Sequence, residues 1–139
     1  MSRESDLGWA AGIIDGEGCI QLYRTTGTRG VGWVLRVMVN NTSLVMLNRL
    51  QEVFGDGTIR PHRIPTNPRH RPTWSWSVAA KKAETALRLI EPYLVNKREE
   101  ARVGLHSRSL IRQHGINTAN PNDEQLRWLK GQLSTLKRA

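Results

Sequence analysis

Residues 19–41 alternate between apolar and polar side chains on both sides of a glycine-rich turn and read CIQLYRTTGTRGVGWVLRVMVNN. A period of two places successive side chains on opposite faces of a β-strand. The stretch therefore predicts a long β-hairpin with an apolar underside and a polar, basic upper side. The residues expected on the underside are Ile20, Leu22, Leu35, Val37 and Val39.

The rest of the chain supplies a second pair of strands and the helices that can cover such an underside. The apolar alternation typical of strands recurs in residues 58–63 and 74–78. The apolar spacing typical of helices is found in residues 7–15, 43–54, 80–91, 97–110 and 123–136. Ser5 or Asp6 is placed to cap the first helix, and Thr42 or Ser43 the second. The order predicts an α+β fold in which an αββαββα domain packs helices on one face of an antiparallel sheet, followed by a helical tail.

Trp74 and Trp76 alternate with Ser75 and Ser77 in the last of these strands. Tryptophans in a basic protein can stack on nucleic acid bases. Their alternation with Val78 instead favours a position in the core.

Length and composition restrict the class of protein. A chain of 139 residues with 38% hydrophobic and 24% charged side chains suits one folded domain, so we treat residues 1–139 as a single unit. The single cysteine, Cys19, excludes a disulfide framework and a cysteine-based zinc site. The sequence shows no signal peptide and no apolar run near the roughly 20 residues of a membrane span. We expect an intracellular protein without a membrane partner.

The charge is large and unevenly distributed. The net charge is +9 and the pI about 10.8. Residues 1–18 carry one basic and four acidic side chains, whereas residues 19–139 carry twenty basic and eight acidic ones. A basic body with a small acidic segment suits a polyanionic partner and a cation held between protein and phosphate. A merely solvated basic surface is the alternative that charge alone leaves open.

Gly8, Gly12 and Gly16 recur every four residues in the first predicted helix, with Ala11 beside them. Each glycine destabilises an isolated helix by about 1 kcal/mol relative to alanine. Such a row is useful where a second backbone approaches closely, as in small-residue helix–helix contacts. A glycine-rich loop is the alternative, which the interleaved apolar residues disfavour.

Asp15 and Glu17 lie where the first predicted helix ends. Carboxylates at a helix C-terminus are disfavoured by a few tenths to about 1 kcal/mol, because the last carbonyl groups point outward there. Another interaction must offset this cost.

The segment Ala10–Gly18, AAGIIDGEG, resembles the sequence motif of the LAGLIDADG homing endonucleases. It differs from that motif by Ala for the first Leu, Ile for the second Leu, Gly for the second Ala and Glu for the second Asp. Three further landmarks of the family follow in order, at Asn40–Thr42, at Phe54–Gly57, and at Pro92–Leu94 leading to Lys97. The resemblance covers about residues 6–105, and residues 106–139 form a helical extension outside it.

The resemblance implies a site-specific endonuclease that makes double-strand breaks with short 3′ overhangs at a long DNA target. In the family, the second acidic position of the motif binds a divalent metal, which here implies Mg²⁺ at Glu17, with the Gly16 carbonyl as a further ligand. Lys97 matches the active-site lysine, and Asn41 (or Asn40) matches a polar position that holds the water network. Asp15 is expected to be either an indirect partner of the metal site or a local backbone cap. The family implies a further basic residue after the segment that matches Asn40–Thr42, and at that place the chain instead has Ser43 or Leu44.

A single copy of the motif implies a homodimer, because cleavage of both strands by this family uses two sites related by a twofold axis. The expected interface residues are Gly8, Ala11 and Gly12, and the expected target is roughly palindromic double-stranded DNA. A β-ribbon fits a DNA major groove, so the upper face of the sheet is expected to contact the duplex. The residues expected on it are Gln21, Tyr23, Thr25, Arg36, Met38, Arg60, His62, Ser75 and Ser77.

Other functional classes remain open at this point. A non-catalytic DNA- or RNA-binding relative, such as an intron maturase or a regulator, would keep the fold and the basic sheet. A structural or protein-interaction domain would leave both the charge and the carboxylate at the helix end unexplained.

Overall fold

The computed structural model describes residues 3–27, 30–112 and 121–138, so part of the predicted glycine-rich turn lies outside the described residues. The helices are α1 (Arg3–Glu17), α2 (Leu44–Phe54), α3 (Lys81–Ile90), α4 (Arg98–Arg112) and α5 (Asp123–Arg138), with a short 3-10 turn at Glu91–Tyr93. The strands are β1 (Gly18–Gly27), β2 (Gly30–Asn41), β3 (Thr58–Arg63) and β4 (Thr73–Ala79). Across the described ranges, the helices are too short or too polar to cross a membrane.

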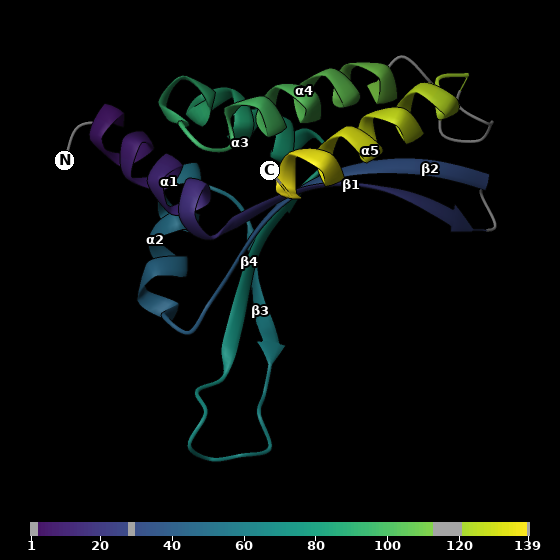
Figure 1. Cartoon of the computed structure of the whole chain (residues 1–139). Helices are drawn as coiled ribbons and strands as arrows, with labels where there is room; N and C mark the ends of the chain where they lie inside the picture. The colour runs from purple at the N-terminus through teal and green to yellow at the C-terminus, as the bar shows by residue number, and fades with distance from the viewer. Residues whose placement is uncertain (1–2, 28–29, 113–120, 139) are drawn as a thin grey trace.

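The four strands form one antiparallel sheet in the order β1-β2-β4-β3. Strand β1 lies at one edge, and β2 pairs with both β1 and β4. Helices α3, α4 and α5 lie together on one side of the sheet (Figure 1). The α+β class and the αββαββα order predicted from the sequence are confirmed.

The main core lies between the apolar face of the sheet and helices α1 to α4. It contains the predicted underside residues Ile20, Leu35, Val37 and Val39. Trp76 is completely buried and its ring stacks on Phe54 at a centroid distance of 5.2 Å. The Trp76 indole donates to the Asp56 carbonyl at 3.1 Å, so this polar group is satisfied inside the core. The inward position of the tryptophans is confirmed for Trp76, while Trp74 is half-buried against the same core.

A second, smaller core joins α5 to the outer half of the hairpin (Figure 1). Leu22 and Trp33 of the hairpin pack against three buried leucines of α5, which are Leu126, Leu129 and Leu133. The helical extension outside the family resemblance therefore covers part of the sheet.

Asp123, the first residue of α5, fixes that helix to the hairpin by polar contacts. Its carboxylate accepts hydrogen bonds from the Trp33 indole at 2.8 Å and from Arg24 at 3.0 Å. Both of these bonds end on Oδ1, and the second carboxylate oxygen of Asp123, Oδ2, accepts a hydrogen bond from Arg127 Nε at 2.9 Å. The Arg127 contact, then those of Trp33 and Arg24, hold the pKa of Asp123 well below its usual value.

Helix α1 is longer than the sequence predicted. It begins at Arg3, so Ser5 and Asp6 lie inside the helix and the predicted capping role is wrong. Asp6 instead pairs with Arg49 of α2 at 2.7 Å. At its other end α1 continues through Glu17 and passes directly into β1.

Gly18 makes this direct transition possible. A Cβ atom at Gly18 would lie 2.8 Å from the backbone of Ile14, closer than real Cβ contacts allow. Only glycine lets β1 leave the helix so close to its last turn. The junction fixes Glu17 at the end of the helix, where the sheet begins.

Candidate catalytic site and nucleic-acid interface

Glu17 is exposed at the α1–β1 junction, and the Asn41 side-chain amide donates a hydrogen bond to its carboxylate. The strand register, with Gly18 opposite Val39, brings the end of β2 beside the end of α1. Asn41 is itself oriented, because its side-chain oxygen accepts from the Ser43 backbone at 2.8 Å. Two of the three residues expected to be catalytic thus lie in direct contact.

Asp15 binds the beginning of α4. Its carboxylate accepts hydrogen bonds from three successive backbone NH groups, those of Val95 at 2.8 Å, Asn96 at 3.1 Å and Lys97 at 2.9 Å. These residues directly precede α4, and a negative charge is favoured near a helix N-terminus. The expected role of a local backbone cap is wrong, because the NH groups that Asp15 binds belong to a segment about 80 residues away, just before α4.

Lys97 turns its side chain back to α1. Its Nζ donates to the backbone carbonyl of Asp15 at 2.8 Å. A cation at the C-terminal carbonyl groups of a helix is stabilising. Asp15 and Lys97 thereby offset part of the cost of placing carboxylates at the end of α1, and Lys97 lies next to the motif as predicted.

Glu17 and Gly16 form a donor set that suits a hard cation. Both residues are exposed, and Gly16 is among the last four residues of α1, whose carbonyl groups have no partner within the helix. Mg²⁺ is often bound by one or two carboxylates together with phosphate oxygens and water. Within residues 3–27, 30–112 and 121–138, no three His, Cys, Asp or Glu side chains gather into a metal site. The protomer offers one carboxylate at this position, which fits a metal shared with a phosphate.

Most of the residues expected to touch DNA lie on one polar face. Six of them line an open depression of about 360 Å³ together with Thr58. These six are Arg36, Met38, Arg60, His62, Ser75 and Ser77. They come from β2, β3 and β4, so the sheet alone assembles this surface. Thr25 is exposed farther along β1, towards the end of the hairpin.

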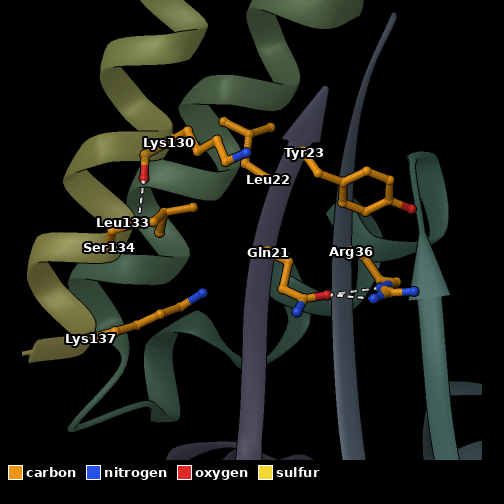
Figure 2. Close-up of a pocket in the computed structure, with 8 residues that line it drawn as sticks. All are labelled: Gln21, Leu22, Tyr23, Arg36, Lys130, Leu133, Ser134 and Lys137. Atoms are coloured by element: carbon orange, nitrogen blue, oxygen red, sulfur yellow. Dashed lines mark hydrogen bonds between the residues drawn. The ribbon is translucent and has the colours of Figure 1, made fainter. Parts of the chain in front are cut away.

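Gln21, Tyr23 and Arg36 form a pre-arranged group at the β1–β2 end of the face (Figure 2). Arg36 donates to the Gln21 side-chain oxygen from Nε at 2.9 Å and from Nη2 at 2.7 Å. Its guanidinium carbon lies 5.4 Å from the centre of the Tyr23 ring, a cation–π contact. These contacts reduce the rotamer freedom that Arg36 would lose on binding.

The residues expected at a dimer interface divide into two groups. Added Cβ atoms at Gly8, Gly12 and Gly16 would meet nothing within 4 Å, so nothing in the protomer requires these glycines. Ala11 is different, because it is completely buried among the protomer's own core residues. Its predicted place at the interface is wrong. One residue advances the helix by about 100°, which turns Ala11 inward while Gly12 faces out.

No protein-family model and no curated protein matches the sequence. Solved structures do match the fold over nearly the whole chain. The homing endonuclease I-CvuI, solved with a DNA target in the presence of magnesium, has a TM-score of 0.74 and 20% sequence identity, over 96% of this chain and 83% of that one. The chain has the LAGLIDADG homing endonuclease fold.

Two further homing endonucleases show the same fold. The archaeal intron-encoded I-Vdi141I, solved with DNA, has a TM-score of 0.77 and 14% identity, over 97% of this chain and 86% of that one. I-TnaI has a TM-score of 0.75 and 14% identity, over 99% of this chain and 95% of that one. The match extends over most of both chains in each case, so this chain and the two neighbours share the fold over most of their lengths.

The structure also brings together residues at the edge of the sheet that the sequence did not single out. Helix α5 brings Lys130, Ser134 and Lys137 to the edge of β1, where they line a depression with Gln21 and Arg36 (Figure 2). Their spacing of four and three residues places them on one side of a helix. The sequence alone shows this spacing, but it does not show which strand the three residues lie beside.

Proposed function

We propose that the protein is a site-specific, divalent-metal-dependent DNA endonuclease. It makes double-strand breaks with short 3′ overhangs at a long, roughly palindromic target inside the cell. The observation that carries this proposal is the position of Glu17. An exposed carboxylate is held by Asn41, two residues beyond the Asp15 carbonyl that binds the Lys97 side chain, and it lies where a polar and basic sheet face begins.

The residues of the site have separate tasks in this proposal. Glu17 and the Gly16 carbonyl would hold Mg²⁺, which when bound polarises a phosphate and lowers the pKa of an attacking water. Asn41 donates to Glu17 and keeps its carboxylate at the edge of the sheet. Lys97 presents a cation beside the motif, where charge develops during phosphodiester hydrolysis.

Recognition of DNA is assigned to the upper face of the sheet. Arg36 and Arg60 are the best candidates for contacts with guanine, since arginine binds the O6 and N7 atoms of guanine through two hydrogen bonds. Both line the same depression as His62, Ser75 and Ser77.

Cleavage of both strands requires a second Glu17, which we assign to a second copy of the chain. The outward stripe of Gly8, Gly12 and Gly16 supports this assignment, since a second helix α1 can approach it closely. Two protomers related by a twofold axis would bring two carboxylates to the two strands.

The decisive experiment is selection of cleaved sites from a randomised duplex DNA library in the presence of magnesium. The proposal predicts one long, roughly palindromic sequence among the cleaved molecules, with breaks in both strands. Selection of the same library by binding provides the comparison. Enrichment by binding without any cleavage would identify the protein as a non-catalytic DNA-binding relative of these enzymes.

A further inference from the structure

Helix α5 presents a stripe of polar side chains to the outer edge of β1. The stripe consists of Lys130, Ser134 and Lys137, and all three residues are exposed. Together with Gln21, Tyr23 and Arg36 they line an open depression of about 340 Å³ (Figure 2). This depression lies beside the edge strand β1 and continues the polar face of the sheet to which the DNA contacts are assigned.

The stripe also extends towards the candidate catalytic site. Lys137 lines a second depression, of about 580 Å³, together with Gly18, Asn96 and Lys97. Glu99 and Glu100 lie in this second depression as well, and Glu99 is paired with Arg102 at 2.8 Å. Lys137 thus lies between the polar face of the sheet and Gly18, the last residue of the motif.

The position of the stripe is fixed by the opposite side of the same helix. Leu126, Leu129 and Leu133 are buried against the hairpin, and Asp123 binds Trp33 and Arg24. In the described part of the chain, no acidic side chain forms an ion pair with Lys130 or Lys137. The helix that carries the two lysines therefore has a fixed position, and their ammonium groups are available to an external anion.

We propose that Lys130 and Lys137, with Ser134 between them, form a phosphate-binding rail that holds one DNA strand along the edge of β1; the Ser134 hydroxyl donates to the Lys130 carbonyl at 3.3 Å, so the lysines supply the contacts. This inference rests on the proposed function and adds a contact made by the helical extension. Seven residues of helix span about 10 Å, which corresponds to about three base-pair steps of 3.4 Å. Phosphate contacts fix the register of a protein on the duplex, while base contacts supply specificity.

The test measures binding of duplex DNA at several salt concentrations. The logarithm of the binding constant falls linearly with the logarithm of salt concentration, with a slope of about 0.9 for each phosphate contact on duplex DNA. We expect Lys130→Ala and Lys137→Ala each to reduce the slope by about 0.9 per bound protomer. Lys81→Ala removes the same charge from an exposed position at the start of α3 and is the matched control.

The outcomes separate the rail from the proposed function. If wild-type protein binds duplex DNA but the two lysine variants keep its salt dependence, the rail is overturned and the sheet-based proposal stands. An equal reduction by Lys81→Ala would also overturn the rail, because it would reflect only the net charge. Wild-type protein that fails to bind duplex DNA would overturn both proposals.

Discussion

Asp15 and Lys97 are joined by two hydrogen bonds. The Asp15 carboxylate accepts from the Lys97 backbone NH at 2.9 Å, and the Lys97 side chain donates to the Asp15 backbone carbonyl at 2.8 Å. The pair joins the end of α1 to the start of α4. Glu17 is two residues beyond this joint. The position of the candidate metal-binding carboxylate therefore depends on contacts made by residues 82 positions apart in the chain.

Replacing Asp15 by alanine removes the acceptor of three backbone NH groups in residues 95–97, just before α4. We expect the free energy of unfolding to fall by about 1–3 kcal/mol, the usual cost of removing a charged hydrogen-bond partner. Asn should retain part of the effect, because its side-chain oxygen still accepts hydrogen bonds from backbone NH groups. Urea unfolding of the wild type and the two variants measures these differences.

Glu124→Ala is the control for Asp15→Ala, since it removes a carboxylate from an exposed position in the first turn of α5. It should change stability by less than the Asp15 variant. Equal losses in the two variants would show that the contacts of Asp15 with residues 95–97 contribute no special stability.

Glu17→Gln tests the catalytic assignment. Glutamine keeps the shape and can still accept from Asn41, but it lacks the charge that would bind a divalent metal. We expect cleavage of the selected target to be lost while binding is retained. Near-normal cleavage by this variant in magnesium would remove Glu17 from the site. Calcium in place of magnesium should support binding of the wild type without turnover.

The sequence predicted the elements of the fold because their patterns are local. Alternation in residues 19–41 and helical spacing in residues 43–54 are read within a single element. Ser43 caps α2 as expected, since its hydroxyl accepts from the Met46 backbone at 3.2 Å. The family resemblance assigned Glu17 and Asn41 to one site but did not predict that their side chains share a hydrogen bond, which the structure shows.

Contacts between distant segments were not predictable in the same way. The partner of Asp15 lies about 80 residues away, and no local rule identifies it. Ala11 and Gly12 differ by one position, so a small error in the orientation of α1 exchanges an interface residue for a core residue. The sequence places Lys130 and Lys137 on one side of a helix, but it does not show that this side lies beside β1.

Arg36 and Arg60 are each expected to contact one guanine in a half-site, and Arg36 is oriented by Gln21. If each binds a guanine, its replacement by alanine should cost about 1–3 kcal/mol of discrimination at one base pair in each half-site. Arg36 is held by Gln21, so Gln21→Ala should weaken the same base preference as Arg36→Ala. Binding to target variants with single base changes measures these preferences. A uniform loss of affinity for all sequences would make the arginine a phosphate contact.

Asp123→Asn should change how stability depends on pH. The folded-state pKa of Asp123 lies below its ordinary value of 3.8. Its ionisation therefore stabilises the fold above the unfolded-state pKa, and this contribution is lost as pH falls through the folded-state value. The difference in unfolding free energy between wild type and Asp123→Asn should be constant above about pH 5 and shrink below about pH 4. A difference that persists unchanged into strong acid would contradict the role of the charge.

Gly12 provides the test of the second protomer. A Cβ atom at this position meets nothing within 4 Å in the protomer, and Gly12 is exposed. Replacing a helical glycine should therefore stabilise an isolated protomer, with Ala about 1 kcal/mol better than Gly. If a second helix α1 packs there, a larger side chain overpacks the contact instead, at a typical cost of 1–3 kcal/mol.

We expect Gly12→Val to weaken dimerisation and to abolish double-strand cleavage together, because it separates the two Glu17 carboxylates. Sedimentation and a plasmid-nicking assay on the same preparation measure both effects. Gly131→Val is the control, since Gly131 is also exposed and unobstructed on a helix but lies on α5. A Gly12→Val protein that remains dimeric and cuts both strands would place Gly12 outside the interface. The two protomers would then have to meet through a surface other than the glycine stripe of α1.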